Sequence, residues 1–268
     1  MRYSQWGAAD NPRVLVCVHG LTRVGRDFSR LAEALCDQYR VVCPDVVGRG
    51  RSDWLPDPML YSVPQYAFDM ATLIARLDVE RVDWLGTSMG GLIGLSLAGQ
   101  PDAPIGRLIL NDIGPRMQLD ALQRIADYVG RPMRFASLDE ATEYVRSIST
   151  GFGLTSPREW RELTESVVAS DGSQWVFLYD PAIAEPLKGT SEATNAASEA
   201  KLWQLYDAIQ ARTLVLRGAD SDLLSSATAV EMTQRGPRAE LAKIPGVGHA
   251  PMFFDEAQIA IVRRFLLA

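Results

Sequence analysis

The sequence predicts an α/β protein with a mostly parallel, doubly wound sheet and a helical region inserted between two of its core strands. Short, continuous apolar runs at residues 14–18, 82–86 and 108–110 alternate with segments whose apolar residues recur at helical spacing. Such runs are typical of parallel strands that helices cover on both faces. The alternation stops after Asp112 and returns at residues 213–217, which places the insertion between these two points.

The chain is expected to divide into a core and an inserted helical cap. We expect the core at residues 1–115 and 207–268, and the cap at residues 116–206. Polar helical patterns at residues 119–129 and 159–169 predict helices in the cap. The cap has no convincing run of β-branched residues, so no strand is expected there.

Composition favours a soluble globular protein. The chain has 268 residues, of which 47% are hydrophobic and 22% are charged, and its net charge is −6. An acidic chain without a basic run is not expected to bind nucleic acid, and no apolar stretch is long enough to suggest a membrane protein. No secretory signal is recognisable, and Cys17 and Cys43 lie in apolar runs typical of buried free thiols. We therefore expect a cytoplasmic protein.

Residues 86–90 form a Gly-x-Ser-x-Gly motif between an expected strand and an expected helix. A serine on so tight a turn exposes its hydroxyl, and the flanking glycines remove Cβ atoms that would clash. The N-terminus of the following helix directs N–H groups and positive dipole towards charge that develops nearby. Ser88 is therefore the candidate nucleophile.

The only two histidines of the chain are His19 and His249. His249 follows glycines in the loop after the last expected strand, where a base for Ser88 is needed. His19 follows the first apolar run and is expected to bond to the loop backbone instead. In that loop, the N–H of Leu21 is expected to form an oxyanion hole with the N–H of Met89.

No metal or organic cofactor is expected. Two histidines are too few for a typical zinc site, and no Cys-x-x-Cys pair replaces them. The glycine turn at residues 45–52 lacks the lysine of a phosphate-binding loop, so we interpret it as scaffold.

These motifs, in this order, resemble the α/β-hydrolase fold superfamily over essentially the whole chain. They are His19-Gly20, Asp45-x-x-Gly48-x-Gly50-x-Ser52, Gly86-x-Ser88-x-Gly90 and Gly248-His249. The resemblance implies a triad of serine, acid and histidine, an oxyanion hole and a helical cap. It also implies hydrolysis of an ester-like bond through an acyl-enzyme. A serine at the nucleophile position argues against the branches that use a carboxylate nucleophile.

The acid of this implied triad has two candidates. The superfamily usually places it where this chain has Ser221, with Asp222 one residue further along. A minority of members takes it from the preceding strand in a pattern similar to Asp-Ile-x-Pro, which residues 112–115 match. Asp112 is therefore the expected acid and Asp222 the alternative.

The expected function is a carboxylesterase-like hydrolase for small or medium acyl groups. The alternatives are a carbon–carbon bond hydrolase or enol-lactonase of aromatic degradation, or a ligand sensor with residual hydrolase activity. The cap has more acidic than basic side chains, which disfavours strongly anionic thioesters. We expect a small ester-like substrate as the partner, and a monomer or a homodimer.

Overall fold

The computed structural model describes residues 1–189 and 191–268, in which seven strands form one sheet in the order β1-β3-β2-β4-β5-β9-β10. These strands are β1 (Arg2–Trp6), β2 (Val14–Val18), β3 (Arg40–Asp45), β4 (Val82–Thr87), β5 (Ile105–Asn111), β9 (Arg212–Gly218) and β10 (Glu240–Ile244). Neighbouring strands pair in parallel, except that β1 pairs antiparallel with β3. The expected mostly parallel sheet is confirmed.

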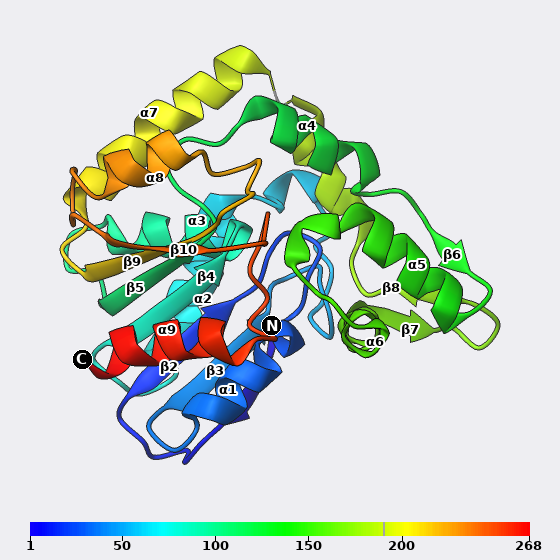
Figure 1. The fold of residues 1–268 in the computed structure, drawn as a ribbon, viewed down its shortest axis with the longest axis horizontal. Helices are drawn as coiled ribbons and strands as arrows, with labels where there is room; N and C mark the ends of the chain where they lie inside the picture. Colours follow the sequence, from blue (N-terminus) through cyan, green and yellow to red (C-terminus); the bar gives the residue numbers. More distant parts are fainter. Residues whose placement is uncertain (190) are drawn as a thin grey trace.

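Helices cover both faces of this sheet, as a doubly wound fold requires (Figure 1). On β2, Leu15 and Cys17 belong to one apolar core and Val16 belongs to the other. The first core lies under α1 (Ser29–Leu35) and α9 (Glu256–Leu267), and the second under α2 (Val63–Ala75), α3 (Met89–Ala98), α7 (Glu192–Ala208) and α8 (Ser226–Met232). Among the described residues, no helix is both long and apolar enough to cross a membrane.

The chain between β5 and β9 leaves the sheet and forms the inserted region. Besides α7 it contains α4 (Leu119–Tyr128), β6 (Arg134–Phe135), α5 (Leu138–Ile148), η3 (Thr150–Phe152), α6 (Pro157–Val167), β7 (Val168–Ser170), β8 (Trp175–Phe177) and η4 (Pro181–Gly189). In Figure 1 the green part of this segment lies beside the core, with β6, β7 and β8 farthest from the sheet, whereas α7, in yellow, lies over the helices of the core.

Two features of the strands correct the sequence analysis. The inserted region is not wholly helical, because β6, β8 and β7 form a small antiparallel sheet. Its strands have only two or three residues, too few for a periodic pattern to be recognised. The edge strand β1 was also missed, because its exposed and mostly polar residues lack an apolar run.

His19 is a structural residue, as expected. Its Nδ1 lies 2.7 Å from the carbonyl oxygen of Gly20, and its Nε2 accepts a hydrogen bond of 2.9 Å from the N–H of Val46. The ring thereby ties the loop after β2 to the loop after β3. Because Nε2 accepts from an amide, this arrangement requires the neutral imidazole.

Burial lowers the pKa of His19 from 6.5 to about 4. The unfolded chain therefore binds more protons than the folded chain between these two pH values, and acid destabilises the fold. We expect the free energy of unfolding to fall by on the order of 3 kcal/mol from this group as the pH is lowered from 6.5 to 4. Denaturant titrations of the wild type and of His19→Gln measure this, since the variant lacks the contribution. Equal pH slopes for the two proteins would contradict it.

Candidate active site

Ser88 lies on a sharp turn between the end of β4 at Thr87 and the start of α3 at Met89. Its backbone has φ 51° and ψ −116°, a strained conformation for a residue with a side chain. The glycines of the motif are needed for close approach: a Cβ at Gly86 would run into the carbonyl of Gly90, and a Cβ at Gly90 into that of Val18. The turn therefore holds the Ser88 hydroxyl above the end of the sheet.

His249 lies within hydrogen-bonding distance of this hydroxyl. Its Nε2 is 3.0 Å from Ser88 Oγ, and its Nδ1 is 2.8 Å from Asp112 Oδ2. A carboxylate only accepts hydrogen bonds, so Nδ1 carries the proton and Nε2 is free to accept from the serine. The inserted region supports the histidine loop, because the N–H of Gly248 donates to the carbonyl of Gly151 over 2.6 Å.

Asp112 is fully buried directly after β5 and receives three hydrogen bonds. Besides the imidazole, the N–H of Gly218 donates to Oδ1 over 2.8 Å and the hydroxyl of Ser221 to Oδ2 over 2.5 Å. Ser221, at the position where the superfamily usually has its acid, thus donates to the carboxylate that reaches His249. These bonds fix the orientation of the carboxylate.

The structure does not bring the alternative acid to His249. The Asp222 side chain is 51% exposed and pairs with Arg124, with 2.7 Å between Arg124 Nη2 and Asp222 Oδ2. It does not cap α8 either, because Ser225 is the N-cap of that helix. Ser88, His249 and Asp112 therefore come together, and Asp222 stays outside the group.

The two expected oxyanion donors flank Ser88. Met89 is the first residue of α3, and Leu21 lines both cavities that Ser88 lines. In the part of the chain that the structure describes, neither backbone N–H donates to a protein acceptor. Both groups are thus free for an anionic oxygen next to Ser88.

Arg49, a residue that the sequence analysis did not single out, is fully buried and contacts both Leu21 and Met89. Its Nε donates to the carbonyl of Leu21 over 2.8 Å, and its Nη2 lies 3.6 Å from Met89 Sδ. Nη1 donates to the carbonyl of Val47 and the hydroxyl of Tyr66, each over 2.8 Å. Among the described residues no carboxylate is within ion-pair distance, and burial lowers the pKa of the guanidinium.

Asn111 is a second residue that the sequence analysis overlooked, although it directly precedes Asp112. It is fully buried, and its Nδ2 donates to Thr87 Oγ1 over 2.9 Å and to the carbonyl of Pro251 over 2.8 Å. One amide thereby joins the turn that carries Ser88 to the loop that carries His249.

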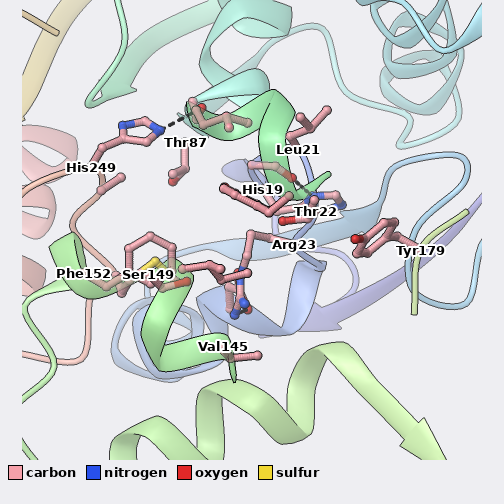
Figure 2. Close-up of a pocket in the computed structure, with 18 of the residues that line it drawn as sticks. His19, Leu21, Thr22, Arg23, Thr87, Val145, Ser149, Phe152, Tyr179 and His249 are labelled. Atoms are coloured by element: carbon pink, nitrogen blue, oxygen red, sulfur yellow. Dashed lines mark hydrogen bonds and ion pairs between the residues drawn. The ribbon is translucent and has the colours of Figure 1, made fainter. Parts of the chain in front are cut away.

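Two cavities meet at Ser88 and share Leu21 and Ile125 as well. The first cavity, shown in Figure 2, has a volume of about 80 Å³ and reaches His249. The second cavity, of about 260 Å³, has mostly apolar walls from α2, α3, α4 and the η4 segment. Ser88 therefore lies where the two cavities join.

The aromatic residues of the inserted region divide between its packed interior and the first cavity. Trp160 lies in the core of the inserted region and Trp203 packs towards α3. The aromatic residues of the inserted region that line the first cavity are Tyr128, Tyr144, Phe152, Phe177 and Tyr179. In the described residues no cluster of three or more His, Cys, Asp or Glu side chains is placed to hold a metal ion.

Known proteins resemble this chain over nearly its whole length. The family model for the alpha/beta hydrolase fold matches residues 13–256. A 3-hydroxybutyrate-oligomer hydrolase of Cupriavidus necator is 52% identical over 269 residues, covering 99% of this chain and 92% of the relative.

Two solved structures share the fold at lower identity. A putative hydrolase from Rickettsia typhi has a TM-score of 0.90 and 32% identity, over 99% of this chain and 90% of the other. An alpha/beta hydrolase from Novosphingobium aromaticivorans has a TM-score of 0.87 and 36% identity, over 99% and 93%. The expectation of an ester hydrolase is confirmed by the family and the relative, and the chain belongs to the alpha/beta hydrolase fold family.

Proposed function

We propose that this protein hydrolyses the ester bonds of short 3-hydroxybutyrate oligomers through an acyl-serine intermediate. The observation that carries the chemistry is the continuous contact from Ser88 through His249 to the buried Asp112. The substrate class is supported by the relative named for it, to which 99% of this chain aligns at 52% identity.

In the first half of the proposed reaction, His249 removes the proton of Ser88 as the serine oxygen attacks the ester carbonyl. The carbonyl oxygen becomes an anion and accepts from the N–H groups of Leu21 and Met89. Asp112 stabilises the imidazolium that forms. His249 then gives the proton to the leaving alkoxide, which departs as one hydroxy acid.

In the second half, water attacks the acyl group on Ser88 while His249 acts as base again. The same two N–H groups hold the second anion. Breaking the bond to Ser88 releases the acyl part as a carboxylic acid and returns the proton to the serine. The balance is one ester and one water consumed, and one acid and one alcohol formed.

Arg49 acts in this scheme through the oxyanion hole. This buried guanidinium has neutral hydrogen-bond partners and lies against the rings of Tyr61 and Tyr66, and its countercharge, Asp180, lies beyond ion-pair distance. A buried charge without an ion-pair partner is costly for the fold, so we infer that it serves the reaction. By binding the Leu21 carbonyl it orients the N–H groups of that loop, and its charge favours the oxyanion. Arg49 is thus a positioning residue that does not touch the substrate.

The nucleophile assignment predicts that the purified protein releases 3-hydroxybutyrate from its linear dimer and that Ser88→Ala lowers kcat by about 10⁶-fold. The matched control is Ser96→Ala, on the same helix but away from the turn, which keeps the wild-type rate. Thermal unfolding verifies that Ser88→Ala is folded. A few per cent of the wild-type rate in pure variant protein would contradict the assignment. A wild type that cleaves only carbon–carbon substrates would overturn the proposed ester substrate.

The acid is tested by comparing Asp112→Asn with Asp222→Asn, since both substitutions keep the shape and remove the charge. The Asp112 variant is expected to lose roughly 10³- to 10⁴-fold in kcat, because the imidazolium loses its partner. The Asp222 variant breaks an exposed ion pair with Arg124 and keeps its activity. If Asp222→Asn loses activity and Asp112→Asn keeps it, the acid is Asp222 and the assignment to Asp112 is wrong.

The Arg49 assignment predicts a loss in kcat with little change in KM. Arg49→Met removes the charge, and we expect kcat to fall by about 10- to 100-fold. Arg49→Lys keeps a charge and restores part of the rate. An active-site label counts the folded sites in the Arg49→Met preparation. If Arg49 has a purely structural role, kcat per folded site equals that of the wild type.

A further inference from the structure

The two cavities at Ser88 differ in a way that assigns the two halves of the substrate. During the proposed reaction His249 Nε2 must give its proton to the leaving oxygen, so the leaving half lies on the histidine side. His249 lines the first cavity and not the second. The leaving hydroxy acid therefore occupies the first cavity, and the acyl half the second.

The first cavity contains a buried cation that is held in place. Arg23 is only 9% exposed, and its Nε and Nη2 donate to the two oxygens of Asp27 over 2.7 and 2.8 Å. Nη2 also lies 3.4 Å from the Leu163 carbonyl and from Ser166 Oγ. The guanidinium is thus fixed from one side.

Two donors in this cavity have no protein acceptor among the described residues. Arg23 Nη1 makes no hydrogen bond, and neither does the hydroxyl of Ser149, a residue that is 8% exposed. Both residues line the first cavity together with Thr22 (Figure 2). Neither atom is among the fully buried polar atoms that lack a partner, so both are open to the cavity, where water or a ligand supplies the acceptor.

Gly20 lies beside both the stem of this arginine and the nucleophile. A Cβ built on Gly20 would lie 3.6 Å from Arg23 Cγ and 3.7 Å from Ser88 Cβ. The Arg23 stem and the Ser88 side chain therefore both approach the backbone of Gly20. In a linear 3-hydroxybutyrate ester the terminal carboxylate is three bonds beyond the leaving oxygen, so it must lie in the same cavity as that oxygen.

We propose that the first cavity is a carboxylate subsite, in which Arg23 Nη1 and the Ser149 hydroxyl bind the free terminal carboxylate of the leaving hydroxy acid. This inference rests on the proposed ester hydrolysis and adds its direction: the enzyme removes one unit at a time from the carboxyl end. A charge-assisted bond to a buried arginine accounts for recognition of the free acid.

The test compares the linear 3-hydroxybutyrate dimer as the free acid with its methyl ester, which has the same scissile bond and no terminal charge. For the wild type, kcat/KM is expected to be about 10- to 100-fold higher for the free acid. In Arg23→Met this ratio falls to about one, and in Ser149→Ala it falls part of the way. Arg124→Gln, which alters an exposed arginine at the same cavity, is the matched control and keeps the wild-type ratio.

Each contrary outcome has a distinct meaning. Equal wild-type values for acid and methyl ester overturn the subsite and leave the ester hydrolase intact. A ratio lost in Arg124→Gln and kept in Arg23→Met overturns the assignment to Arg23. Cleavage of neither dimer overturns both proposals. Arg23→Met leaves Asp27 unpaired and can fail to fold. In that case the ratio of kcat/KM for free acid and methyl ester, measured in the wild type and in Ser149→Ala, still tests the subsite.

Discussion

Two segments that are far from Asp112 in the sequence meet at its buried carboxylate. It accepts hydrogen bonds from the end of β9 at Gly218, from Ser221 in the following loop, and from His249 after β10. β5 and β9 are parallel neighbours, so their carboxyl ends converge and make this meeting possible. The orientation of His249 towards Ser88 depends on this one group.

The inserted region supports the site, but its net charge does not decide the charge that a substrate meets. Gly151 holds the loop of His249, and the N–H of Gly50, next to Arg49, donates to the carbonyl of Leu178 in the insertion. The acidic surplus of the insertion does not reach the site. In the described chain, neither cavity is lined by an acidic side chain from residues 116–206. The charged residues that line the first cavity are Arg23, Arg124 and Asp27, which is paired with Arg23. Total charge was therefore a poor guide to the charge around the substrate.

The sequence was sufficient to locate Ser88, because the chemistry of a strand-to-helix turn is local. His249 followed from the scarcity of histidines and from its glycine loop. The choice between Asp112 and Asp222 could be stated but not decided from spacing, because two adjacent strand ends offered an acid. What separates them is tertiary: Asp112 has φ 55° and is buried, whereas Asp222 lies outside in an ion pair.

Arg49 and Arg23 could not have been recognised from local patterns. Arg49 lies in a glycine turn that we interpreted as scaffold, and its contacts to Leu21 and Met89 join segments far apart in the sequence. Arg23 follows the oxyanion loop closely, but only the fold shows which of its nitrogens is left without an acceptor. The short strands of the insertion were missed for a related reason, since their pairing and not their sequence defines them.

The acyl-serine is the central claim, and direct trapping tests it most sharply. The protein is mixed with the linear 3-hydroxybutyrate dimer, quenched in acid within the first turnover, digested and analysed by mass spectrometry. The peptide containing Ser88 is expected to gain one 3-hydroxybutyryl group and to lose it on the time scale of turnover. Product formation without an adduct under conditions where deacylation limits the rate, or an adduct on another residue, would contradict it.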